Sequence, residues 1–240
     1  MKKLLFAVLA VAVLSVSGAQ AAVKMDEKYF TVKAPKIEEI AEDRMVLDSI
    51  SHRMKPSVVE AAPSADPFAE INLAEVFLDK IVNFGKKAWN IVSANQPVVN
   101  IQTDVANALP TGVAAWQSMQ GWQTPVSKVF HVSYENLYGM TTVDFTYRVL
   151  FTPGGNINGR GAYLTQVTVI PADVHVVWGF TFNMKASVPS ITNAGTSQSP
   201  VAGAQVQVAW DVNTVVSHNE EIANYYVRGD GMFTDLNNGN

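Results

Sequence analysis

From residue 98 onward, apolar and polar residues alternate with a period of two, and this alternation constrains the fold more than any other feature. The clearest run spans 142–151, where Val143, Phe145 and Tyr147 share one face with polar residues between them. Such alternation is typical of strands with one buried face. We predict further strands at about 99–105, 126–135, 161–170, 174–184, 205–213 and 222–233. The apolar stripes of 174–184 and 205–213 place Trp178 and Trp210 in the predicted core.

About seven strands with short connections indicate an antiparallel β-sandwich or meander, in which successive strands pair as hairpins. The Pro-Gly-Gly-Asn run at 153–156 predicts one turn between strands. The segment 189–203, rich in Ser, Thr, Gly and Asn, predicts the one long exposed loop. The expected class is therefore mainly β.

One long amphipathic helix is predicted over 67–94, which would make the protein α+β. Asp66 can cap its N-terminus and Pro67 suits the first helical position. At 100° per residue most apolar residues of this segment fall on one half of the cylinder. We expect that face to pack on the β-sheet, with Phe77 and Ile81 at the centre of the interface. A helix lying on a membrane surface is the alternative, although Glu75 and Asp79 would offset its lysines.

The first 21 residues have the pattern of a Sec-type signal peptide. Lys2 and Lys3 precede an apolar run over 4–16, and Ala19 and Ala21 supply the small residues read at cleavage. Thirteen apolar residues are short for a bilayer, so no membrane span is expected after cleavage. We expect an exported protein, periplasmic or secreted.

Residues 22–66 form a charged N-terminal arm in this interpretation. Ile40, Leu47 and Met54 recur every seven residues, but this stripe is too narrow to build a core, so the arm is expected to be helical or partly disordered. Three prolines within 55–67 predict a linker to the domain at 67–240. We expect that 22–66 can be deleted without unfolding the rest.

Composition excludes several classes of function. The chain has no cysteine, which excludes disulfides, thiolate metal sites and a cysteine nucleophile. A net charge of −4 argues against a nucleic-acid partner. We find no nucleophile, phosphate-loop or metal-ligand motif, so no catalytic residue, metal site or cofactor is predicted. His131, His175 and His218 lie in the predicted β-region and could meet at a metal, but no spacing requires it.

The aromatic residues provide one functional lead. Trp116 and Trp122 are interleaved with amides, and indoles in such a setting can stack on a sugar or anchor a partner protein. They could equally close one end of the sandwich. We therefore expect an exported, non-catalytic binding or interaction module of the cell envelope, with a protein or glycan partner. The alternatives are an envelope-polymer hydrolase, which would need carboxylates such as Glu135 and Asp144 to converge in a cleft, and a structural surface-assembly protein.

Overall fold

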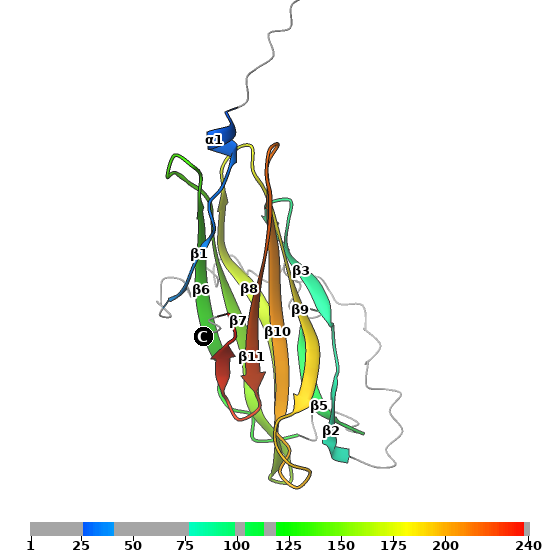
Figure 1. Ribbon diagram of the computed structural model, residues 1–240. Coiled ribbons are helices and arrows are strands. Elements are labelled where there is room, and N and C mark those ends of the chain that lie inside the picture. Colours follow the sequence, from blue (N-terminus) through cyan, green and yellow to red (C-terminus); the bar gives the residue numbers. More distant parts are fainter. Residues whose placement is uncertain (1–25, 41–76, 99–103, 113–118, 238–240) are drawn as a thin grey trace, which may run out of the picture.

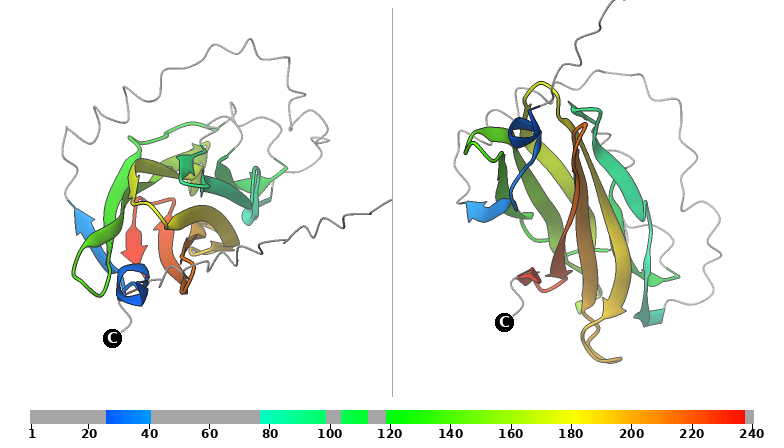
Figure 2. Two further views of the ribbon diagram at one scale, coloured as in Figure 1. Left: turned by 90° about the horizontal axis from the view of Figure 1, so that it is seen from above. Right: turned by 45° about the horizontal axis from the view of Figure 1, so that its top comes forward.

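Two antiparallel β-sheets packed face to face make up the molecule (Figures 1 and 2). The computed structural model describes residues 26–40, 77–98, 104–112 and 119–237. The predicted mainly β, antiparallel architecture is confirmed, with twelve strands among the described residues in place of about seven. Within those ranges no helix is long and apolar enough to cross a membrane.

Each sheet has six strands. The first has the order β1-β6-β7-β8-β5-β2 and the second the order β12-β11-β10-β9-β3-β4. In chain order the elements are α1 (Glu27–Phe30), β1 (Lys36–Ile40), β2 (Phe77–Asn83), β3 (Ala88–Ser93), β4 (Gln96–Pro97), β5 (Ala106–Thr111), β6 (Val126–Glu135), β7 (Thr141–Ile157), β8 (Arg160–Val176), β9 (Thr181–Asn193), β10 (Ala202–Asn213), β11 (His218–Arg228) and β12 (Phe233–Asp235).

The core lies between the sheets and is built by the alternating residues that the sequence predicts to face inward. Phe145 on β7 and Phe182 on β9 are fully buried, with ring centroids 4.5 Å apart. Trp210 on β10 is also buried, as predicted, and its indole N–H donates to the Tyr134 hydroxyl of the opposite sheet at 2.8 Å. A second bond between the sheets joins the buried hydroxyl groups of Tyr147 and Tyr225 at 2.5 Å. These four buried polar groups thus find partners across the core.

The predicted helix over 67–94 is wrong where the structure describes it, because 77–83 and 88–93 form strands β2 and β3. Gly85 between them has φ +134°, and a Cβ there would lie 2.3 Å from the Val105 carbonyl oxygen. A helix cannot pass through that conformation. Trp89 and Ile91 alternate inward, whereas Phe77 sits on an edge strand, 36% exposed, and not at the centre of an interface.

The predicted strand over 174–184 is also wrong, because a turn at 177–180 divides it between β8 and β9. Gly179 has φ +86°, a left-handed conformation that favours glycine and reverses the chain. Trp178 in this turn is 84% exposed, which corrects its predicted place in the core. The chain crosses from the first sheet to the second at this point.

Two predicted connections lie elsewhere. The Pro-Gly-Gly-Asn run at 153–156 continues β7, and the hairpin turn follows at 158–159. The loop predicted over 189–203 shrinks to 194–201, because β9 runs to Asn193 and β10 starts at Ala202. Turn-forming residue types were a poor guide here because strand pairing extends through both segments. Residues 153–156 belong to β7, which pairs with β8, and residues 189–193 belong to β9, which pairs with β10.

The described part of the predicted arm packs against the sandwich. β1 pairs with β6 along the edge of the first sheet, and Phe30 and Val32 are buried. Lys36–Ile40 is a strand here, not part of a helix. Residues 1–25 and 41–66, with the proline-rich linker, lie outside the described residues, so the boundary at 66 stays a prediction.

Candidate functional site

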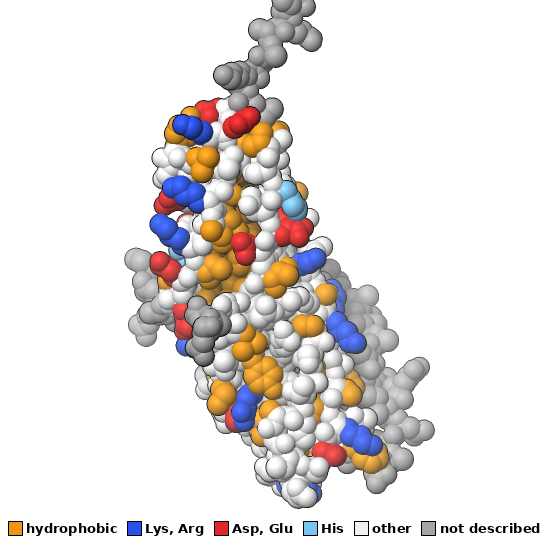
Figure 3. All heavy atoms as spheres, viewed as in Figure 1, with side chains coloured by type: hydrophobic (Ala, Val, Ile, Leu, Met, Phe, Trp, Pro, Cys, Tyr) orange, Lys and Arg blue, Asp and Glu red, His pale blue; other side chains and the backbone are white. Residues whose placement is uncertain are grey.

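Three turns between strands meet at one end of the sandwich and carry large exposed hydrophobic side chains. The turns are 136–140, 177–180 and 214–217, and together with α1 they form what we call the apolar end, at the top of Figure 1. Its exposed members are Leu137, Tyr138, Met140, Trp178, Val215 and Val216. A space-filling view shows hydrophobic side chains at this end beside a few charged ones (Figure 3).

Local hydrogen bonds hold two of these turns. The Asn136 side-chain oxygen accepts from the backbone N–H groups of Tyr138 and Met140, at 3.0 and 3.1 Å. The Thr214 hydroxyl oxygen accepts from the N–H groups of Val216 and Ser217, at 3.2 and 2.9 Å. Asn and Thr close turns in this way, which leaves the other turn side chains free to point outward.

Helix α1 ties the three turns together although it is only four residues long. The backbone N–H of Leu137 donates to the Lys28 carbonyl at 3.2 Å. The Tyr29 hydroxyl donates to the Trp178 carbonyl at 3.3 Å. The hydroxyl groups of Thr214 and Ser217 both donate to the Phe30 carbonyl at 2.9 Å. Every turn of the apolar end is therefore anchored to one short segment.

Beneath the exposed side chains lies an aromatic layer. The Phe30 ring is buried between Trp178, at a centroid distance of 6.5 Å, and Phe180, at 6.1 Å. A Cβ on Gly179 would lie 2.6 Å from the Phe30 ring. The turn thus approaches the ring as closely as only glycine allows, and Trp178 is held pointing outward.

The electrostatics of this end are muted, because none of the three turns contains a charged residue. Charged residues adjoin the turns: Glu135 directly precedes Asn136, and Asp26 and Glu27 lie at the start of α1. The Tyr138 hydroxyl donates to the Asp26 carboxylate at 3.0 Å, and this hydrogen bond raises the pKa of Tyr138. The phenol therefore stays a neutral donor at physiological pH.

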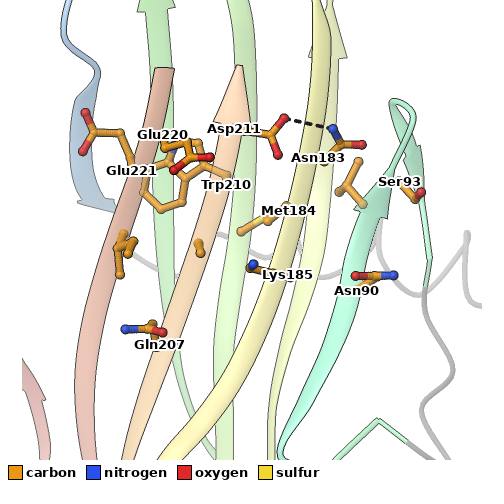
Figure 4. A pocket seen from close by; sticks show the side chains of 13 residues that line it. Asn90, Ser93, Asn183, Met184, Lys185, Gln207, Trp210, Asp211, Glu220 and Glu221 are labelled. Carbon is orange, nitrogen blue, oxygen red and sulfur yellow. Dashed lines mark hydrogen bonds between the residues drawn. The ribbon is translucent and has the colours of Figure 1, made fainter. Parts of the chain in front are cut away.

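A second candidate is a hollow of about 410 Å³ on the outer face of the second sheet, across β3, β9, β10 and β11 (Figure 4). Polar side chains dominate its outer rim, among them Asn90, Lys185, Gln207 and Glu220. The Asp211 carboxylate accepts hydrogen bonds from the side-chain amides of Asn183, at 2.9 Å, and Asn213, at 2.6 Å.

Several polar groups that line this hollow already bond to one another or to neighbouring residues. The Gln207 side chain bonds to Ser187 and to Asn224. The Glu220 carboxylate is hydrogen-bonded to His218 Nε2 at 3.0 Å. Asp211 and Glu220 face each other directly across β10 and β11, and each carboxylate already has a hydrogen-bond partner of its own. The apolar end carries six exposed large hydrophobic side chains, whereas Ile222 is the one such side chain among the residues that line the hollow.

Of the two tryptophans predicted to bind a ligand, Trp116 lies outside the described residues. Trp122 is half-buried and packs against the core at the opposite end from α1, beside Gly155. A Cβ on Gly155 would lie 2.2 Å from the indole ring. The structure does not bring Trp122 to the apolar end, and its binding role stays a prediction.

The predicted histidine and carboxylate groups come together only in part: Asp144 bonds to His131 and is the cross-strand partner of His175, whereas His218 lies on the other sheet. His131 Nε2 and the Asp144 carboxylate form a pair at 2.8 Å on the outer face of the first sheet. Glu135 accepts from Lys33 and Lys36, at 3.1 and 3.2 Å, and these bonds lower the pKa of its carboxyl. Within the described ranges no three His, Asp or Glu side chains gather as metal ligands would.

Comparison with known proteins adds no relative: a scan against family models, a search of curated proteins and a search of solved structures each found no match.

Sequence reasoning missed every exposed member of the apolar end. A signal was present, since Leu-Tyr-Gly-Met at 137–140 and Val-Val at 215–216 are unusual choices for turns, which favour Gly, Pro, Asn, Asp and Ser. Trp178 was hidden because it continues an alternating stripe. Only the fold brings the three segments to one place.

Proposed function

We propose that this protein is an exported, non-catalytic binding module of the cell envelope and that the apolar end is its binding surface. One observation carries the proposal: six exposed large hydrophobic side chains from three separate turns gather at one end of the sandwich. Contiguous exposed apolar surface is costly in water and commonly marks an interaction site.

The rigidity of this end supports the same function. α1 is bonded to all three turns, and the Phe30 ring packs beneath Trp178. A surface that is already ordered loses little conformational entropy when it binds. The exposed side chains are thus presented in a fixed arrangement.

The hydrolase considered from the sequence has less support. Its two named carboxylates, Glu135 and Asp144, are each paired with basic side chains, and the pKa of Glu135 is lowered, whereas a general acid needs a raised one. A protein or glycan partner at Trp116 and Trp122 remains a separate prediction.

Retention on bacterial envelope fragments tests the proposed function. We define the tip variant as Leu137→Ser, Trp178→Ser and Val215→Ser together, and the control variant as Val98→Ser, Ile222→Ser and Met232→Ser. All six residues are exposed hydrophobics, but the control set lies away from the three turns. We expect the wild type and the control variant to sediment with the fragments and the tip variant to remain in the supernatant.

Equal retention of all three proteins would overturn the proposal. Loss of retention in the control variant alone would also overturn it and would favour the hollow, since Ile222 lines it. A thermal melt of each variant confirms folding, because exposed side chains contribute little to stability.

A further inference from the structure

We propose that the apolar end inserts into the interfacial zone of a lipid bilayer, with the strands of the sandwich standing upright on the membrane. This inference rests on the proposed function and names the partner of the same surface. It follows from the shape, the side-chain chemistry, the charge and the hydrogen bonding of the three turns.

The shape of the apolar end suits a soft partner. Its exposed hydrophobics occupy three projecting turns at the ends of strands, and the hollow found on the protein lies elsewhere, across the outer face of the second sheet. Trp178, the most exposed of them, stands on a turn between the two sheets. Separate projections can each enter lipid, which needs no complementary pocket.

The side chains belong to types that partition into membrane interfaces. Trp178 and Tyr138 combine an apolar ring with a polar group, and such residues concentrate at the level of lipid headgroups. Leu137, Met140 and Val215 supply purely apolar surface beside them. Insertion would remove this surface from water.

Charge sets both the depth and the kind of lipid. The turns 136–140, 177–180 and 214–217 contain no charged residue, so their burial desolvates no ion. Beside them at the same end of the molecule (Figure 1), α1 carries Glu27 and Lys28 and is capped by Asp26, so these charges limit insertion to the level of the headgroups. Because these charges nearly cancel, attraction to anionic lipid is not required and binding should resist salt.

Hydrogen bonding within the turns is compatible with entry into lipid. Polar backbone atoms that enter lipid must be satisfied internally, because hydrocarbon offers no donors or acceptors. The turns meet this condition at many atoms: Gly139 N–H bonds the Asn136 carbonyl, Phe180 N–H the Val177 carbonyl and Thr214 N–H the Ser217 carbonyl. The bonds from the Asn136 and Thr214 side chains satisfy further N–H groups. These N–H groups can therefore leave water without losing a hydrogen-bond partner.

The test uses vesicles of pure phosphatidylcholine and the exported chain, with its N-terminus read by mass spectrometry so that a retained leader is detected. We expect the wild type to float with the vesicles equally at 0.1 M and about 1 M salt. The tip variant should bind at least about tenfold more weakly, since three buried apolar side chains are lost. The control variant should bind like the wild type.

Fluorescence locates the contact. Brominated phosphatidylcholine should quench the tryptophan emission of the wild type, because Trp178 enters the bilayer. Trp178→Phe keeps an apolar ring, so it should still float with vesicles but lose most of the quenching. Quenching that persists in Trp178→Phe would overturn the orientation proposed here.

The outcomes separate this inference from the proposed function. Tip-dependent retention on envelope fragments without vesicle binding would refute the lipid partner and leave the binding module standing. Loss of tip dependence in both assays would refute both. Sedimentation velocity gives one more refuting result: a dimer of the wild type that the tip variant abolishes would show that a second copy covers this end.

Discussion

The two ends of the sandwich perform the same structural task with opposite chemistry. At the polar end, which we define as the turns 158–159, 194–201 and 229–232, hairpins close with Asn, Gly, Ser, Thr and Asp, and Met232 is the one large exposed hydrophobic among those turns. The apolar end closes its three turns with six such residues. Both ends reverse β-strands of the same two sheets.

This difference teaches that the apolar residues are not needed to make the turns. The polar end shows that Asn158 and Gly159 reverse this chain with no large side chain at all. At the apolar end Asn136, Gly139 and Thr214 likewise allow the chain to reverse. The exposed Leu, Trp and Val residues between them therefore serve something other than the fold, which is the basis of the binding proposal.

The largest expected effect is on the free energy of unfolding and comes from the buried tyrosines in the sheets between the two ends. Burial raises the pKa of Tyr163 to about 12 and holds the pKa values of Tyr134, Tyr147 and Tyr225 above their ordinary value. Unfolded tyrosines ionise near pH 10. Below that pH the stabilisation from these protonated phenols is complete, and it is lost as the pH rises through about 10 to 12.

Urea unfolding at pH 8, 10 and 11 measures this loss, with tyrosinate absorbance recorded alongside. Tyr138→Phe, at the exposed surface of the apolar end, serves as the control and should leave the steep alkaline decline in place. A free energy of unfolding that stays constant up to pH 11 would contradict the role given to the buried phenols.

Next in size is the loss of the aromatic layer under the apolar end. Phe30→Ala removes a buried ring that contacts Trp178 and Phe180, and should lower the free energy of unfolding by about 3 kcal/mol. Met232→Ala at the polar end should cost less than about 0.5 kcal/mol. Chemical denaturation compares the two. A small effect of Phe30→Ala would show that the folded body does not need the described part of the N-terminal arm.

Each end of the sandwich carries a tryptophan, so the contributions of Trp122 and Trp178 to stability can be compared directly. Trp122→Ala should cost about 2 kcal/mol, because the half-buried indole packs on the core beside Gly155. Trp178→Ala should cost less than about 0.5 kcal/mol, since its side chain is in water. Thermal melts of the two variants check this. A larger loss of stability for Trp178→Ala than for Trp122→Ala would assign a structural role to Trp178 and would support the predicted ligand-binding role of Trp122.

The smallest effect separates turn strain from steric contact. Gly179 and Gly159 both have positive φ, +86° and +75°, but an added Cβ meets the Phe30 ring only at Gly179. Gly159→Ala should cost about 1 kcal/mol for its backbone conformation, and Gly179→Ala about 1 kcal/mol more. Equal losses in a denaturation series would mean that the Phe30 ring yields freely and that the apolar end is less rigid than we infer.

Alternation predicted the strands whose two faces differ most. Residues 126–135 match β6 at both ends, and the predicted segment 205–213 lies within β10, because one face of each strand packs into the core while the other meets water. The prediction failed where two periods overlap. Within the segment 77–93, apolar residues recur three or four apart, as in a helix, but several also recur two apart, as in a strand. The positive φ of Gly85 is incompatible with a continuous helix, and the segment forms strands.

The candidate site was beyond reach of the same reasoning. Leu137, Trp178 and Val215 are far apart in the chain, and each adjoins a strand pattern that explains it locally. Their common place depends on strand order, on the chain crossing between sheets at 177–180, and on α1 bonding three turns at once.

The sequence by itself determined that this chain forms antiparallel sheets, because side chains in a strand alternate between faces and burial selects one of them. It also determined where Trp210 would lie, at the middle of an unbroken stripe. Only the tertiary structure decided that Trp178 leaves such a stripe and stands in solvent. Gly179, with a positive φ that glycine adopts readily, turns the chain there. The Phe30 ring packs closely on this turn, a contact between residues that sequence periodicity cannot relate.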